Sequence, residues 1–208
     1  LLIIGCGGHS TVVSDIASLI GFNDINHIEY NLLEDESPND KTFHKIYENY
    51  SGSFFVAIGN NYLRERVTKN FQLRNPSADL ESLIHPNSYV SKGSHIGEGT
   101  AVMPLAVINS HSLIGKGTII NTASIVEHHN ELEDFSSLAT GAKLGGNVFI
   151  GYRSAVCING TISNGVKIGK DVVIGGSSFV INDIEDNYLA YGIPAKLIRK
   201  RKASDTYM

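Results

Sequence analysis

Residues 113–126 read LIGKGTIINTASIV, and an aliphatic residue recurs in this stretch at every sixth position. Stepping by six from Ile84 to Val180 meets seventeen positions, and each of them is Ile, Val or Leu. A period of six is typical of a parallel β-helix, in which a short strand and a tight corner alternate along the chain. A β-sandwich would instead show a period of two. The hexads therefore predict a β-helix.

Three hexads close one triangular coil, so seventeen hexads predict between five and six coils. The aliphatic side chains of successive coils are expected to stack in an internal ladder. Gly and Asn supply the corner dihedrals that other residues disfavour. We assign residues 81–208 to this β-helix domain. Its basic tail after Ala195 is expected to be a frayed, solvated end.

The first eighty residues have a different pattern. An apolar run, Leu1–Ile4, is followed by the turn GCGGHS (residues 5–10) and by apolar residues at helical spacing up to Ile20. A second apolar run, residues 54–58, precedes Gly59-Asn60-Asn61 and a second helical segment, which Asn61 is expected to cap. The alternation predicts a small Rossmann-like α/β domain over residues 1–80. Its ligand is expected at the carboxyl ends of the strands, where both glycine turns lie.

Composition narrows the function classes. The net charge of -4 argues against a general nucleic-acid binder, because such proteins need a positive field. No window approaches the ~20 apolar residues that span a bilayer. The two cysteines lie far apart and no signal-peptide pattern is present, so we expect a cytoplasmic protein. Leu1 lies inside an apolar run, and we expect residues to precede it.

Two sets of motifs carry a resemblance to known proteins. The hexads, followed by Gly192-Ile193-Pro194-Ala195-Lys196, resemble the hexapeptide acyltransferase superfamily, which implies a left-handed parallel β-helix. The turn of residues 5–9, the strand end of residues 57–61 and the entrance Leu83-Ile84-His85-Pro86 resemble bacterial sugar acyltransferases. The likeness is greatest to the bacillosamine-pathway UDP-4-amino-sugar N-acetyltransferases, which have perosamine N-acetyltransferases and sialic acid O-acetyltransferases as relatives.

This resemblance implies a homotrimer with active sites between adjacent subunits. It implies transfer of acetyl from acetyl-CoA to the 4-amine of a UDP-linked 4-amino-4,6-dideoxy-N-acetylhexosamine, with no metal. A GDP-linked amino sugar or a sialic acid hydroxyl is the alternative acceptor. Two readings outside the transferases are a zinc-dependent lyase like the γ-class carbonic anhydrases and a non-catalytic nucleotide-sensing β-helix.

Acetyl transfer to an amine needs a base, and histidine suits that role near neutral pH. The run NTASIVEHH (residues 121–129) resembles the family segment that carries the catalytic histidine, which makes His128 the base by resemblance. Relatives carry an acidic residue where this chain has His129. A histidine cannot supply a fixed negative charge, so the orienting partner stays open among His129, Glu127, Glu131 and Asp134. Neither cysteine has an evident base partner, so we expect direct transfer.

The resemblance also implies two sets of ligand-binding residues. For acetyl-CoA these are Gly141, Gly146, Ile158 and Gly176, with Ala142 nearby. For the nucleotide sugar they are Gly7, Gly8, His9, Glu29, Tyr30, Asn60 and Arg64, with Asn121 toward the acceptor. Residues 18 apart stack in neighbouring coils, so His129 is expected to lie over His111, with Asn147 one coil later. The zinc reading depends on such stacked ligands.

Overall fold

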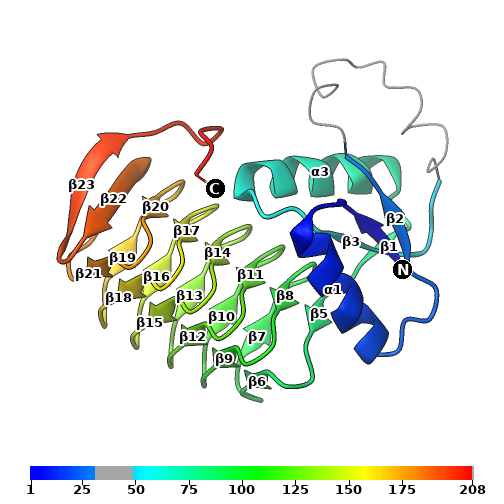
Figure 1. The fold of residues 1–208 in the computed structure, drawn as a ribbon, viewed down its shortest axis with the longest axis horizontal. Coiled ribbons are helices and arrows are strands. Elements are labelled where there is room, and N and C mark those ends of the chain that lie inside the picture. The colour runs from blue at the N-terminus through cyan, green and yellow to red at the C-terminus, as the bar shows by residue number, and fades with distance from the viewer. Residues whose placement is uncertain (31–48, 208) are drawn as a thin grey trace.

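The structure is a computed structural model that describes residues 1–30 and 49–207. An α/β unit lies at one end of a left-handed parallel β-helix, whose coils stack side by side (Figure 1). This is the fold class that the sequence predicts.

The α/β unit contains one parallel four-stranded sheet, in the order β2-β1-β3-β4. Helix α1 packs on one face of the sheet, together with the start of the β-helix, and α3 packs on the other. The elements are β1 (Leu2–Ile4), α1 (Gly8–Leu19), β2 (Asn26–Ile28), β3 (Ser53–Val56), α3 (Asn61–Arg74) and β4 (Asp79–Leu80).

The glycine turn after β1 has a structural requirement at its first residue. Gly5 has φ +130°, and a Cβ there would lie 2.7 Å from the carbonyl oxygen of Ala57 at the end of β3. A side chain is therefore excluded at Gly5 by both conformation and space. Gly7 and Gly8 have open space beside them instead.

The β-helix has three faces of parallel strands. The eight-stranded face contains β5 (Leu83–Ile84), β8 (Ala101–Val102), β11 (Ile119–Ile120), β14 (Ser137–Leu138), β17 (Ala155–Val156), β20 (Val173–Ile174), β22 (Tyr188–Gly192) and the antiparallel β23 (Ala195–Lys200). The six-stranded face contains β6 (Tyr89–Val90), β9 (Val107–Ile108), β12 (Ile125–Val126), β15 (Lys143–Leu144), β18 (Thr161–Ile162) and β21 (Phe179–Val180). The five-stranded face contains β7 (His95–Ile96), β10 (Leu113–Ile114), β13 (Glu131–Leu132), β16 (Phe149–Ile150) and β19 (Lys167–Ile168).

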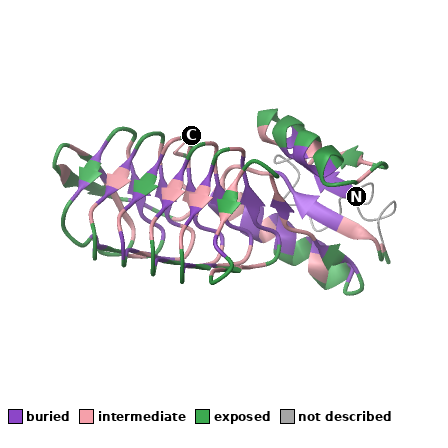
Figure 2. Ribbon diagram, turned by 90° about the horizontal axis from the view of Figure 1, so that it is seen from below, coloured by how far each residue is buried: buried purple, intermediate pink, exposed green. Residues whose placement is uncertain are grey.

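The predicted aliphatic ladder is the core of these coils. Ile114, for example, pairs with Ile96 in the preceding coil and with Leu132 in the following one, 18 residues away on each side. From Val102 to Val180 every sixth residue is buried, whereas the corners are largely exposed (Figure 2). Each buried aliphatic side chain contributes roughly 1.5–3 kcal/mol by leaving water. The ladder thus holds the coils in register.

The strands meet at three corners, each a column of four-residue turns. The small-residue corner follows the eight-stranded face and includes residues 121–124, 139–142, 157–160 and 175–178. The histidine corner follows the six-stranded face and includes residues 109–112, 127–130 and 145–148. The junction corner follows the five-stranded face and includes residues 115–118, 133–136, 151–154 and 169–172.

Helix α3 joins the α/β unit to the junction corner through a buried arginine. Arg64 is 1% exposed and all five of its N–H groups donate to protein acceptors. These acceptors are the carbonyl oxygens of Ile58, Gly59, Gly117, Phe135 and Ser136 and the side-chain oxygen of Asn61, at 2.7–3.2 Å. Burial lowers the pKa of Arg64 to about 10, so the guanidinium stays charged at neutral pH. Arg64 is a structural anchor between the two parts of the chain.

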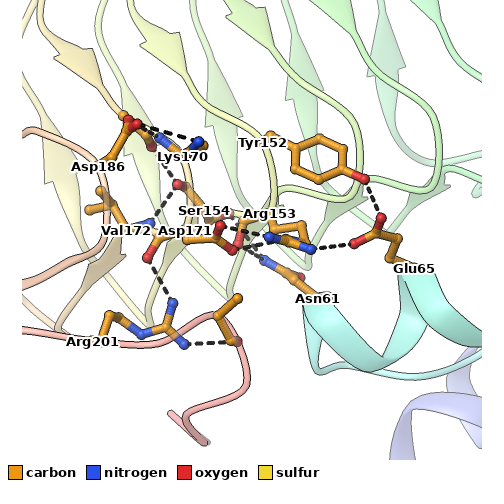
Figure 3. A network of polar contacts seen from close by, with 12 residues as sticks. Asn61, Glu65, Tyr152, Arg153, Ser154, Lys170, Asp171, Val172, Asp186 and Arg201 are labelled. Atoms are coloured by element: carbon orange, nitrogen blue, oxygen red, sulfur yellow. Dashed lines mark hydrogen bonds and ion pairs between the residues drawn. The ribbon is translucent and has the colours of Figure 1, made fainter.

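Ion pairs add to this connection between α3 and the junction corner (Figure 3). Arg153 donates two hydrogen bonds to Asp171, at 2.8 and 2.7 Å, and a third to Glu65 on α3, at 2.7 Å. Lys69 and the Tyr152 hydroxyl also donate to Glu65. Burial alone would raise the pKa of Glu65, but the hydrogen bonds from Lys69, Tyr152 and Arg153 lower it. The junction corner is therefore tied to α3 by charge-assisted bonds.

The C-terminal tail is ordered, which corrects the expectation of a frayed end. Strand β23 pairs with β22, and Arg201 is 7% exposed, with hydrogen bonds to the carbonyl oxygens of Asp171 and Asp205. The Tyr207 hydroxyl accepts a hydrogen bond from the backbone N–H of Asn61 at 3.0 Å. The tail therefore reaches back to the start of α3. The basic composition gave no hint of this docking, because its hydrogen bonds go largely to backbone groups.

Candidate active site

His128 lies exposed on the histidine corner and is held by its neighbour in the chain. Its Nδ1 is 3.1 Å from Nδ1 of His129, and the two rings are nearly perpendicular at 82°. The His129 ring in turn stacks over His111 of the preceding coil, with ring centroids 5.0 Å apart. The expected stacking of residues 18 apart is thus present. Three imidazoles lie in one column of corners.

Gly146 lies directly over His128 in the next coil. A Cβ at Gly146 would lie 2.5 Å from Cε1 and 2.8 Å from Nε2 of His128, which no real contact permits. The absence of a side chain at Gly146 is therefore what lets the His128 ring lie against the coil. The Gly146 N–H donates to the Asn164 side chain at 2.8 Å, so this backbone position is fixed as well.

The acidic residues considered as partners of His128 have other contacts. Glu127 accepts a hydrogen bond from Asn109 at 3.0 Å, and Asp134 accepts one from the backbone N–H of Lys116 at 2.8 Å. Glu131 points outward from the five-stranded face and is exposed. The bond that the structure gives His128 is to His129.

The other β-helix residues implied by the resemblance lie at the opposite edge of the six-stranded face. Gly141, Ile158 and Gly176 belong to the small-residue corner in successive coils. Asn121 belongs to the same corner, and its side-chain oxygen accepts a hydrogen bond from Thr122 N–H at 2.7 Å. Within the chain, strands of the six-stranded face separate this corner from the histidine corner. His128 and Gly146 are brought together, whereas the remaining residues form a second group.

A cavity of about 430 Å³ adjoins the small-residue corner at Ile158 and Gly176. Its wall also contains Cys157, Arg199 and Tyr207, none of which the sequence singled out for ligand binding. Burial raises the pKa of the Cys157 thiol, which disfavours a thiolate nucleophile there. For Arg199 the prior signal was the basic character of the tail, and for Cys157 and Tyr207 nothing in the sequence signalled ligand binding.

The glycine turn of the α/β unit forms a second polar site. Gly7 precedes α1 as its N-cap, and the space beside Gly7 and Gly8 is open, so a ligand can approach the helix N-terminus. Burial, together with the nearby Arg64 charge, lowers the pKa of His9 to about 4, so this imidazole is neutral at pH 7. Its Nε2 is buried without a hydrogen-bond partner within residues 1–30 and 49–207.

Two residues implied for the nucleotide site have structural roles. Arg64 has no N–H left for a phosphate, which corrects the expectation that it binds one. Asn60, rather than Asn61, is the N-cap of α3 and accepts from Leu63 N–H at 3.0 Å. Asn61 instead donates to the carbonyl oxygens of the junction corner. Glu29 is exposed after β2, and Tyr30 packs against the core under α3.

The described part of the chain lacks two features. No group of three or more His, Cys, Asp or Glu side chains in residues 1–30 and 49–207 is arranged to hold a metal ion. The helices of these same ranges lack the length and apolar content needed to cross a membrane.

A parallel β-helix of hexads, an exposed corner histidine and a nucleotide-type α/β unit together define a hexapeptide-repeat acyltransferase. The family model described as the PglD N-terminal domain matches residues 1–71. UDP-N-acetylbacillosamine N-acetyltransferase of Bacillus subtilis is 31% identical over 116 residues, and this match spans about half of that protein's length (50%) and 49% of this chain.

Solved structures extend the likeness to nearly the whole chain. A histidine-to-asparagine variant of perosamine N-acetyltransferase from Caulobacter crescentus, in complex with CoA and GDP-perosamine, is 31% identical and covers 96% of both chains, with a TM-score of 0.85. The acetyltransferase domain of PglB from Neisseria gonorrhoeae, in complex with acetyl coenzyme A, is 30% identical and covers 95% of this chain and 98% of that one, with a TM-score of 0.80. The chain belongs to this family of sugar N-acetyltransferases.

Proposed function

We propose that the protein transfers the acetyl group of acetyl-CoA to the 4-amine of a UDP-linked 4-amino-4,6-dideoxy-N-acetylhexosamine. The observation that carries the proposal is the exposed His128 imidazole, held between His129 and Gly146 on a β-helix that matches CoA-bound sugar N-acetyltransferases along its length. The match to the Bacillus subtilis enzyme supports the UDP-linked acceptor. The family likeness favours a transferase over a zinc lyase or a nucleotide sensor.

In the proposed step the sugar amine attacks the carbonyl carbon of the thioester directly. His128 Nε2 takes one amine proton as the C–N bond forms. The resulting imidazolium returns this proton to the sulfur as the C–S bond breaks, so CoA leaves as its thiol. Glu127 and His129 flank His128 on the histidine corner. No acyl-enzyme is formed. The raised pKa of Cys157 supports this, because a protonated thiol is a poor nucleophile.

The two groups of β-helix residues support a site between subunits. We propose a homotrimer in which the histidine corner of one subunit faces the small-residue corner of the next. Acetyl-CoA would then lie along Gly141, Ile158 and Gly176, with its thioester near His128 and Gly146 of the neighbouring subunit. Ile158 is 59% exposed in the single chain, as an interface or ligand contact would require.

The nucleotide would bind at the open turn of Gly7 and Gly8, where the helix N-terminus attracts the diphosphate. The unpartnered Nε2 of His9 supports a ligand hydrogen bond there. Glu29, Tyr30 and Asn60 would flank the base and ribose, and Asn121 the acceptor sugar. A cytoplasmic location follows from the proposed co-substrate, because acetyl-CoA is made inside cells.

A GDP-linked 4-amino sugar is the second candidate acceptor. The observation in its favour is the match over 96% of both chains to an enzyme bound to GDP-perosamine.

The test is the rate of CoA thiol release from acetyl-CoA with each acceptor. We expect turnover with the UDP-linked amino sugar, a large loss in His128→Ala, and no loss in His27→Ala, an exposed histidine on β2. Turnover with GDP-perosamine or sialic acid alone would replace the acceptor and keep the mechanism. Absence of turnover with all three would refute the proposed activity.

The subunit arrangement is tested by complementation. Gly176→Trp is expected to block acetyl-CoA and His128→Ala to remove the base, so each variant alone is inactive. Co-expression of the two is expected to restore activity, because some sites then combine one intact corner from each chain. Failure of mixed oligomers to recover any activity would contradict a site shared between subunits.

A further inference from the structure

We propose that His129 is a positioning residue that keeps the proton of His128 on Nδ1 and so leaves its Nε2 free to act as the base. The inference rests on the proposed role of His128. It assigns the orientation of His128 to a neutral imidazole.

The proton count at the contact leaves two arrangements, and the proposed base role of His128 selects one of them. Nδ1 of His128 and Nδ1 of His129 are 3.1 Å apart, and a hydrogen bond needs one donor and one acceptor. The contact therefore holds a single proton. If His128 donates it, His129 is neutral with its own proton on Nε2, and His128 Nε2 carries a free lone pair. If His129 donates it, His128 Nε2 is protonated and cannot act as a base.

The surrounding coils fix His129 in place for this role. Its backbone has φ 57°, and its N–H donates to the carbonyl oxygen of Ser110 at 3.0 Å. Its ring lies over His111 at an interplanar angle of 32°. On the other side, the carbonyl oxygen of His128 accepts from Asn147 N–H at 3.0 Å. The backbones of both residues are thus fixed by the neighbouring coils, and the His129 ring is also held by its contact with His111.

No carboxylate is engaged with the pair in the described structure, although charged groups lie around it. Glu127 on the same corner is bonded to Asn109, and His111 is the titratable group of the coil below. Gly146 and Asn147 above are uncharged, and the flanking strands present Glu131 and Lys143 outward. A neutral acceptor orients His128 but does not stabilise its imidazolium by charge.

Three substitutions at position 129 separate the acceptor from the ring and from the backbone. Asn keeps an acceptor oxygen, Asp adds a charge, and Phe keeps a ring over His111 without any acceptor. The chain itself shows that each residue type fits this left-handed corner backbone, because Asn147 has φ 59°, Asp171 has φ 54° and Phe135 has φ 56°. The variants His129→Asn, His129→Asp and His129→Phe are therefore matched in conformation.

We expect His129→Asn and His129→Asp to keep kcat within about fivefold of the wild type, and His129→Phe to lower it at least about tenfold with an unchanged KM for acetyl-CoA. In His129→Asp the acidic limb of the pH–rate profile should move to higher pH, because the carboxylate favours the imidazolium. Nitrogen-15 NMR of the wild type should show the His128 proton on Nδ1.

Equal rates in His129→Phe and His129→Asn, or a His128 proton found on Nε2, would overturn the proposal. These outcomes are distinct from failure of the proposed function. If His128→Ala keeps wild-type turnover, the base assignment is lost whatever the position-129 variants do. If His128→Ala is inactive while His129→Phe is fully active, only the positioning role is lost.

Discussion

The junction corner and the histidine corner have the same backbone and opposite chemistry. Both place residues other than glycine in the left-handed region, Arg153 and Asp171 in the first and His111 and His129 in the second. At the junction corner Arg153 and Asp171 are bound in a network with Glu65 on α3. At the histidine corner the rings are exposed and contact one another.

The difference shows how one repeated turn can serve two purposes. At the junction corner, which packs on α3, the charged side chains form ion pairs that hold the α/β unit to the coils. At the histidine corner one imidazole nitrogen of His128 has no such structural partner among the described residues and can act in the reaction. Substitutions at the histidine corner should therefore change turnover and leave stability intact, whereas substitutions at the junction should do the reverse.

The largest effect is expected for His128→Ala. Loss of a general base lowers kcat by roughly 10²–10⁴-fold. Since the side chain is exposed, the free energy of unfolding should change by no more than about 0.5 kcal/mol. Steady-state kinetics and urea denaturation of the same preparation measure both quantities. A loss of unfolding free energy well above about 0.5 kcal/mol would mean that the histidine corner has a structural role.

Arg64→Met tests the opposite side of the comparison. The substitution removes the charge and leaves several buried carbonyl oxygens without donors, so we expect a loss of about 3–5 kcal/mol in unfolding free energy. The control is Lys92→Met in the exposed turn between β6 and β7, where the expected loss is below about 0.5 kcal/mol. Similar values for the two variants would show that the buried anchor does not matter.

The sequence predicts the histidine corner better than it predicts the junction. The six-residue period places Gly146 18 residues after His128 and His129 18 after His111, so both contacts can be read from spacing alone. That arithmetic works because each coil repeats the one before it. It also explains why the aliphatic ladder is correctly predicted.

The junction could not be predicted in this way. Three acceptors of Arg64 are the backbone carbonyl oxygens of Gly117, Phe135 and Ser136, more than fifty residues along the chain. Because every residue has a backbone carbonyl group, no residue type in the sequence marks such an acceptor. The resemblance assigned Arg64 to the nucleotide, and the composition of the tail with Arg201 suggested a solvated end. In the structure both cations bind main-chain oxygens, and the sequence does not reveal such partners.

Gly146→Ala is expected to have an intermediate effect. Its new methyl group would lie 2.5 Å from His128 Cε1, so the exposed imidazole must move, and we expect kcat to fall roughly 10–100-fold with little change in stability. Gly93→Ala is the control, because its methyl group would meet the His111 ring at an ordinary 3.7 Å. Equal kinetics in the two variants would contradict the contact between Gly146 and His128.

The smallest effect is expected for Glu65→Gln, and it should depend on pH. Because the pKa of Glu65 is lowered in the folded protein, its carboxylate stabilises fully above the unfolded value of about 4.3 and loses this contribution as the pH falls through the folded value. We expect a loss of roughly 1–2 kcal/mol in unfolding free energy at pH 7 that shrinks steadily below pH ~4. As a control, Glu185→Gln at an exposed position should change the unfolding free energy by no more than about 0.5 kcal/mol, both at pH 7 and below pH ~4. A pH-independent difference for Glu65→Gln would mean that shape rather than charge holds the junction corner to α3.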